Sequence, residues 1–113
     1  MHEMALAESV VSIAEREARR AGAERITSVR LEIGALSHVV PEAMRFAFSA
    51  VSRGSLAEGA RLDILRVPGR AWCHDCGREI EISALGDACP ACGGYSVQVT
   101  GGQEMRVKDL EVA

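Results

Sequence analysis

Aromatic side chains are scarce in this chain: Phe, Trp and Tyr together make up 4% of its 113 residues. Any apolar core is therefore built mostly from small and medium aliphatic side chains, and a small satellite region would need another source of stability. No apolar run approaches the eighteen or more residues that a membrane-spanning helix needs. The opening residues, Met1-His2-Glu3, lack the basic and then apolar pattern of a secretion signal. We therefore expect a cytoplasmic protein with one small domain, or one domain and a satellite.

An excess of basic residues is also absent. The chain has 13 Lys and Arg against 16 Asp and Glu, which gives a formal net charge of −3. Proteins that bind nucleic acid generally present a basic surface to the phosphate backbone. The charge balance therefore weighs against a generic DNA-binding or RNA-binding protein.

Cysteine is confined to one stretch, where all four cysteines form two pairs with two residues between the members of each pair. The first pair lies in C-H-D-C-G and the second in C-P-A-C-G, and the four residues are Cys73, Cys76, Cys89 and Cys92. Two intervening residues let both thiolates of one tight turn reach a single ion about 2.3 Å away. The glycine after each pair, Gly77 or Gly93, allows the positive φ that such a turn commonly needs. Four sulfurs suit a closed tetrahedral site, so the spacing predicts a structural zinc ion.

Two alternatives exist for these cysteines, namely two disulfides or a redox-active dithiol. The symmetry of the two C-x-x-C-G pairs disfavours both, and a reducing cytoplasm favours metal over disulfides. Four thiolates and one divalent ion would change the formal charge from −3 to about −5.

Hydrophobic periodicity predicts two helices and three strands outside the cysteine stretch. In the first helix we expect an apolar stripe of Leu6, Val10 and Ile13 with Ala7, Ala14 and Ala18 beside them. In the first strand, Val29, Leu31 and Ile33 alternate. The expected helices span 3–21 and 41–54, and the expected strands span 27–33, 60–67 and 103–112. Pro68-Gly69 and Gly101-Gly102 mark boundaries on either side of the cysteine stretch.

This order predicts an α+β fold: a small, mainly antiparallel three-stranded sheet with two helices on one face, plus an inserted zinc-ribbon-like module. The expected division is an α+β domain formed by 1–69 and 100–113 and a zinc-binding module formed by 70–99.

His2 raises the question of a second metal. A histidine next to a free α-amine can offer that amine, its own amide nitrogen and its imidazole to one ion, closing planar chelate rings. Square-planar nitrogen coordination suits Ni(II) or Cu(II), and Glu3 could add its amide or carboxylate. The alternative is that His2 is an ordinary second residue without a ligand role.

A resemblance to a known family bears on this question. Besides Met1-His2-Glu3 and the two cysteine pairs, the chain carries V-R-L-E-I-G-A-L-S from Val29, P-E-A-M-R-F-A-F from Pro41, E-G-A-R-L-D-I from Glu58 and G-Q-E-M-R-V from Gly102. Together these segments resemble the HypA/HybF family of hydrogenase maturation proteins over the whole chain. The resemblance implies a non-enzymatic nickel metallochaperone that works with a GTPase of the HypB type. It would deliver Ni(II) to the large subunit of [NiFe]-hydrogenase and, in some organisms, to urease.

Carried over by position, the resemblance assigns nickel to Met1, His2 and Glu3, and zinc to the four cysteines. His38 is a further candidate nickel ligand, although a loop histidine is usually only solvated. His74 lies within the first cysteine turn, where four sulfurs already complete the shell. Two other functions remain open from the residues alone, a zinc-ribbon nucleic-acid module and a rubredoxin-like electron carrier.

Overall fold

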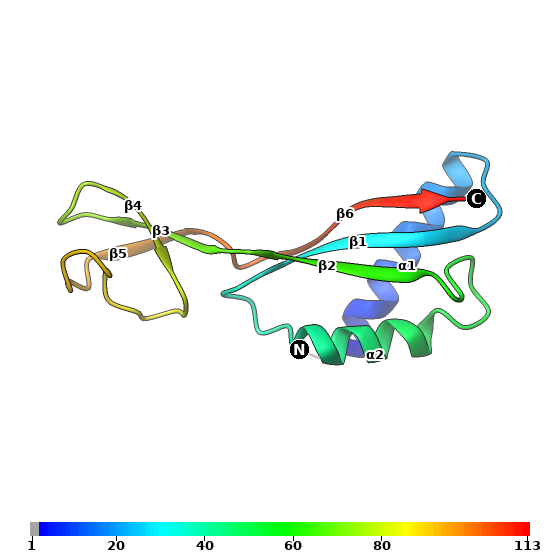
Figure 1. The fold of residues 1–113 in the computed structure, drawn as a ribbon, viewed down its shortest axis with the longest axis horizontal. Helices are drawn as coiled ribbons and strands as arrows, with labels where there is room; N and C mark the ends of the chain where they lie inside the picture. The colour runs from blue at the N-terminus through cyan, green and yellow to red at the C-terminus, as the bar shows by residue number, and fades with distance from the viewer. Residues whose placement is uncertain (1–2) are drawn as a thin grey trace. The chain divides into compact units, whose positions relative to one another are not determined.

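The computed structural model describes residues 3–113, which form two helices and six strands (Figure 1). In chain order these are α1 (Glu3–Arg20), β1 (Ile26–Gly34), α2 (Pro41–Val51), β2 (Arg61–Val67), β3 (Gly69–Cys73), β4 (Arg78–Ile82), β5 (Val97–Gly101) and β6 (Met105–Val112). The strands form two three-stranded sheets, in the orders β2-β1-β6 and β4-β3-β5. None of the helices within residues 3–113 is long and apolar enough to cross a membrane.

The chain divides into two compact units. The first, which we call the helical unit, contains 1–32, 38–65 and 106–113, and the second, the cysteine unit, contains 33–37 and 66–105. Each unit has its own sheet and its own buried apolar side chains. The predicted α+β class, with two helices and small antiparallel sheets, is confirmed.

The central strand β1 explains why both helices cover one face of the sheet in the helical unit. Val29 and Leu31 are fully buried, whereas Arg30 between them is exposed, as expected for a strand with one covered face. The helices α1 and α2 contact each other and cover the apolar face. Ion pairs occupy the other face, where Arg30 binds Asp109 of β6 through two hydrogen bonds.

The buried face of α1 agrees with the predicted pattern in part. Leu6 and Ile13 are only partly buried, while the helix buries a set of smaller residues, Ala7, Val10, Val11, Ala14 and Ala18. Small side chains let a helix approach its neighbours closely, so the alanine side of α1 packs inward. Of the residues in the predicted pattern, Val10, Ala7, Ala14 and Ala18 are buried.

The cysteine unit is built on β3, which pairs antiparallel with β4 on one side and with β5 on the other. One face of this sheet is exposed and includes Trp72. The other face contributes to a compact apolar cluster of Leu36, Ala71, Cys73, Ile80, Ile82 and Cys89, against which Cys76, Val97 and Val99 pack. Two of the predicted zinc ligands, Cys73 and Cys89, are thus part of the only sizeable core that this unit has among the described residues.

Two glycines at the predicted boundaries are required by close packing of backbone. Gly102 has a φ of +87°, and a Cβ there would lie 2.6 Å from the carbonyl oxygen of Pro68. A Cβ at Gly69 would lie 2.5 Å from the carbonyl oxygen of Ile82. Both approaches are too close for any side chain, so these positions are restricted to glycine.

Candidate metal centre

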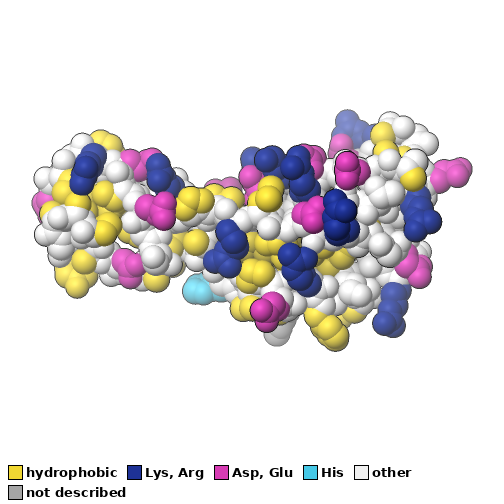
Figure 2. Space-filling view, viewed as in Figure 1, with side chains coloured by type: hydrophobic (Ala, Val, Ile, Leu, Met, Phe, Trp, Pro, Cys, Tyr) yellow, Lys and Arg dark blue, Asp and Glu magenta, His cyan; other side chains and the backbone are white. Residues whose placement is uncertain are grey.

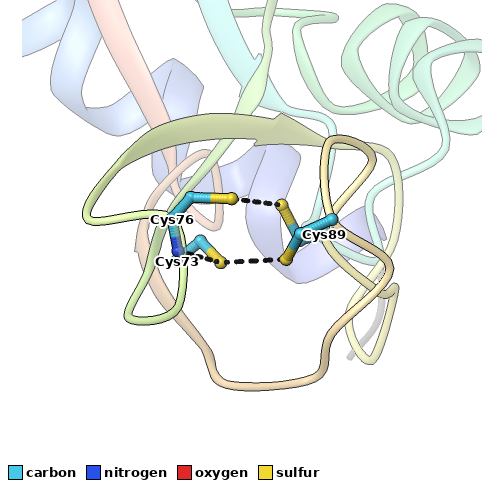
Figure 3. Close-up of side chains that lie close together, drawn as sticks. Cys73, Cys76 and Cys89 are labelled. Carbon is cyan, nitrogen blue, oxygen red and sulfur yellow. Dashed lines mark hydrogen bonds between the residues drawn. The ribbon is translucent and has the colours of Figure 1, made fainter.

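The four cysteines come together from two turns of the cysteine unit (Figure 3). Cys73 ends β3, and Cys76 lies in the turn that leads to β4. Cys89 and Cys92 lie in the segment that joins β4 to β5. The antiparallel pairing of β3 with β4 and β5 places both turns at the same end of the sheet.

The sulfur atoms have the spacing of a tetrahedral site. All four Sγ atoms lie within 4.8 Å of one another. The Sγ atoms of Cys73 and Cys92 are 3.7 Å apart, and those of Cys76 and Cys89 are 3.8 Å apart. Four sulfurs placed about 2.3 Å from a central ion at tetrahedral corners would be about 3.8 Å from one another. The same distances exclude disulfides, in which the sulfurs are about 2.05 Å apart.

Backbone hydrogen bonds hold each pair of cysteines in the same type of turn. The N–H of Gly77 donates to the carbonyl of Cys73, and the N–H of Gly93 donates to the carbonyl of Cys89, both at 2.8 Å. The two glycines have φ values of +67° and +74°. The predicted role of the glycine after each pair, which is to allow a positive φ, is therefore correct.

The cysteine cluster is buried on one side and exposed to solvent on the other. Cys73 and Cys89 are 0% and 2% exposed, whereas Cys92 is exposed. The ring of His74 is exposed and lies with Nε2 3.3 Å from Oε1 of Gln98. Four sulfurs already fill the coordination shell that zinc prefers, so the donor set fits a structural ion without an open position.

The thiols cannot all ionise without a cation. The pKa of Cys76 is raised to about 12, first by its hydrogen bond with the Cys92 thiol and then by burial. The pKa of Cys89 is lowered to about 7, chiefly because the backbone N–H of Cys92 stabilises its thiolate. The backbone N–H of Gly94 lowers the pKa of Cys92, but burial and its bonds with Cys73 and Cys89 contribute to a net rise. The metal-free cluster at pH 7 therefore holds at least two protons, on Cys76 and Cys92.

Zinc binding at pH 7 is expected to release at least two protons per ion, because zinc binds thiolates. The proton count is measured by calorimetry in buffers of different ionisation enthalpy. Acidification should weaken zinc binding, since protons compete for the same sulfurs, and the zinc-dependent stability should disappear as the pH falls. A release of fewer than two protons would contradict the protonation states given above.

Comparison with known proteins identifies the family. The sequence profile described as "Hydrogenase/urease nickel incorporation, metallochaperone, hypA" matches residues 1–112. The chain is 54% identical over 112 residues to "Hydrogenase maturation factor HypA 2" of Bradyrhizobium diazoefficiens, and 55% identical to "Hydrogenase maturation factor HypA" of Rhodopseudomonas palustris, with 99% of both chains covered in each case. This chain belongs to the HypA family. The resemblance seen in the sequence is confirmed.

Solved structures of HypA proteins have the same fold. The solution structure of the Ni metallochaperone HypA from Helicobacter pylori matches with a TM-score of 0.70 at 30% identity, covering 99% of this chain and 97% of the other. A second solution structure of a HypA protein matches with a TM-score of 0.74. The HypA family consists of hydrogenase maturation factors that act as nickel metallochaperones, so the chain is not an enzyme.

The predicted nickel ligands lie mostly outside the described residues. Met1 and His2 precede the first described position, and Glu3 is the first residue of α1, where it is partly exposed. His38 is exposed in the loop between β1 and α2. The assignment of nickel to Met1, His2 and Glu3 therefore stays a prediction.

One contributor to the cysteine unit was missed by sequence reasoning. Leu36 belongs to the apolar cluster around Cys73 and Cys89, although it follows β1 and precedes the cysteine pairs by more than thirty positions. Its backbone N–H donates to the carbonyl of Gly102, and its side chain lies against Gly69. An isolated leucine in a predicted loop carries no sequence signal for such a contact.

Proposed function

We propose that this chain carries Ni(II) at its N-terminus and passes it to the large subunit of a [NiFe]-hydrogenase during maturation. The proposed nickel ligands are the Met1 amine, the amide and imidazole nitrogens of His2, and Glu3. The proposed zinc ligands are Cys73, Cys76, Cys89 and Cys92. A GTPase of the HypB type is the proposed partner in delivery, the cytoplasm is the proposed location, and urease is a second proposed recipient.

The whole-chain match to the HypA family is the observation on which this proposal rests. The chemistry of the two donor sets supports the proposal, because one set suits an ion that is released and the other suits an ion that is retained. A carrier must release its ion, which requires an exposed and incompletely enclosed site. The four-sulfur set is partly buried and leaves no open position, which suits an ion that stays. Nitrogen donors ahead of a helix that starts at Glu3 suit nickel and can exchange it.

The proposal assigns the two metals to two domains. We place nickel on the α+β domain of 1–69 and 100–113, and zinc on the module of 70–99. The two compact units described above divide the chain near these positions. The cysteine unit differs from the proposed module in that it also includes 33–37, 66–69 and 100–105.

Neither nucleic acid nor electron transfer is proposed. The open face of the sheet in the helical unit carries basic and acidic side chains interspersed, as Figure 2 shows. Arg30 pairs with Asp109, and Arg106 pairs with Glu32. A surface whose arginines are neutralised by neighbouring carboxylates is poorly suited to a phosphate backbone.

The test is a nickel titration of protein without added terminal residues, compared with its His2→Ala variant. The variant should lose tight nickel binding because the imidazole and its chelate ring are removed, whereas its zinc content should stay at one ion per chain. His74→Ala is the matched control and should retain nickel, since His74 is exposed, belongs to the cysteine unit and is not in the proposed ligand set. Calorimetry gives the nickel affinity, and elemental analysis gives the zinc content. Unchanged nickel affinity in His2→Ala would refute the proposed site.

A further inference from the structure

A groove of about 540 Å³ runs along strand β6 in the helical unit. Its lining comes from the second half of α1, the residue after it, and β6, and consists of Ile13, Glu17, Ala21, Val107, Lys108, Asp109, Leu110 and Val112. Ile13, Val107 and Leu110 are only partly buried, and Val112 is 40% exposed. The groove therefore leaves apolar surface uncovered on β6 and on α1. The uncovered residue of α1 is Ile13, which the helical periodicity placed in the core.

Strand β6 lies at the edge of its sheet, with β1 on its inner side (Figure 1). Within residues 3–113, no strand pairs with its outer side. An edge strand presents unpaired N–H and C=O groups to any extended chain that can align with it. An edge of this kind beside an apolar groove is the arrangement by which proteins bind a strand of a partner.

The charged side chains of the groove indicate which charge a bound segment should carry. Two of its charged residues have partners: Glu17 pairs with Arg20, and Asp109 pairs with Arg30. Glu111, which is outside the lining but on the same strand, accepts a hydrogen bond from Ser28. Lys108 is exposed and has no ion-pair partner among residues 3–113. The groove is thus left with a positive charge beside apolar side chains.

A second copy of the chain fits this edge poorly. In a two-fold symmetric antiparallel pair, one residue must lie opposite its own counterpart. Centring the pair on Lys108 or Asp109 places a residue opposite a like charge, its own copy. Centring it on Leu110 places Asp109 opposite Glu111. Like charges directly opposite each other destabilise strand pairing, so these three central registers are unfavourable.

We propose that the outer edge of β6 binds an extended segment of a different protein, which carries an acidic side chain opposite Lys108 and apolar side chains directed into the groove. The backbone of the segment adds a strand to the sheet β2-β1-β6. Its apolar side chains cover Ile13 and Leu110, and its carboxylate neutralises Lys108. This surface uses neither the proposed nickel ligands nor the four cysteines.

The probe is a short synthetic peptide of alternating valine and threonine with a central glutamate, added to the zinc-loaded full chain. We expect it to perturb the backbone amide resonances of β6 and of Ile13 and Glu17, and to slow hydrogen exchange at the outward N–H groups of β6. In Lys108→Glu, the affinity for this peptide should fall about fivefold, the scale of one cross-strand charge pair. A peptide with a central lysine should show the reverse preference between the two proteins.

Lys108 is exposed, so its replacement leaves the fold intact, and the unchanged amide resonances of the cysteine unit verify this. A peptide with prolines at its central positions should not bind, because proline cannot donate to the new strand pairing. The proposal is overturned if the glutamate peptide does not bind, if it perturbs residues away from β6, or if charge reversal has no effect. It is also overturned if the outward amides of β6 are already protected in a dimer whose formation depends on protein concentration.

Discussion

Adding three residues before Met1 should abolish tight nickel binding while leaving the zinc content and the fold unchanged. In the proposed chelate the terminal amine and the His2 imidazole bind the same ion, with the intervening amide nitrogen completing planar rings. An extension of three residues converts the amine into an amide and places the new terminus too far from His2 to close contiguous chelate rings. Loss of an outer-shell partner alone lowers metal affinity by about 10–100-fold, so loss of a donor should lower it by at least about 100-fold.

Calorimetric nickel titrations of two extended proteins test this expectation. Extension after Ala113 is the matched control, because it adds the same residues at the other end of the chain and should preserve nickel binding. Equal nickel affinity in the two proteins would mean that the amine is not a ligand and that His2 acts, if at all, through its side chain.

The same site should respond to pH in a defined direction. Nickel competes with protons for the amine and the imidazole, so its affinity should fall as the pH drops through the histidine range, near a reference pKa of about 6.5. The zinc site should hold its ion through the same range in parallel measurements if the two metals are bound by separate ligands. Zinc loss that coincides with nickel loss at every pH would contradict that separation.

The cysteine site could be predicted from sequence because its geometry is local. Two intervening residues and a following glycine determine each turn, and the N–H of Cys76 donates to Sγ of Cys73 at 3.4 Å within one turn. Only the meeting of the two turns depends on the fold, and antiparallel pairing around β3 provides it. The sulfur spacing therefore agrees with what the motif alone implies.

The sheet of the cysteine unit carried a much weaker signal. Strand β3 is five residues long, and its buried positions, Gly69, Ala71 and Cys73, include no large apolar side chain. Its one large apolar residue, Trp72, faces outward and is 40% exposed. Alternation of apolar residues cannot reveal a strand of this composition, because its burial depends on Leu36 and on the cysteines.

The first helix illustrates a limit of a different kind. Apolar residues occur at both Leu6 and Ala7 and at both Ile13 and Ala14, so the sequence is compatible with two stripes that differ by one position. The predicted pattern contained both sets, and the structure buries the alanines rather than Leu6 and Ile13. Close packing against α2 favours the small side chains. The helical period alone does not distinguish between the two stripes.

Removing zinc should unfold the cysteine unit and leave the helical unit folded. Two of the six side chains in the apolar cluster of the cysteine unit are the proposed ligands Cys73 and Cys89. Burying an aliphatic side chain contributes about 1.5–3 kcal/mol, whereas ordering each residue of backbone costs about 1–2 kcal/mol. The remaining aliphatic side chains cannot offset that cost, but a structural zinc ion contributes on the order of 10 kcal/mol.

Residue-resolved amide hydrogen exchange in Cys73→Ser, and in the wild type with and without a chelator, measures this effect. We expect protection to be lost from β3, β4 and β5 and to persist in α1, α2 and β1. His74→Ala is the matched control, because His74 is the exposed neighbour of Cys73 and lies outside the four-sulfur set, so zinc and protection should both remain.

The Cys73→Ser variant also separates the two metals. If nickel is held by the N-terminal residues alone, the variant should still bind nickel after its cysteine unit has unfolded, because no proposed nickel ligand belongs to that unit. Two results would contradict this account. Full protection of β3 in zinc-free protein would mean that the apolar cluster suffices without metal, and loss of nickel as complete as in His2→Ala would mean that the cysteine unit is needed for nickel binding. If zinc is permanently bound for structure and nickel is bound separately for transfer, Cys73→Ser should bind nickel although its cysteine unit is unfolded.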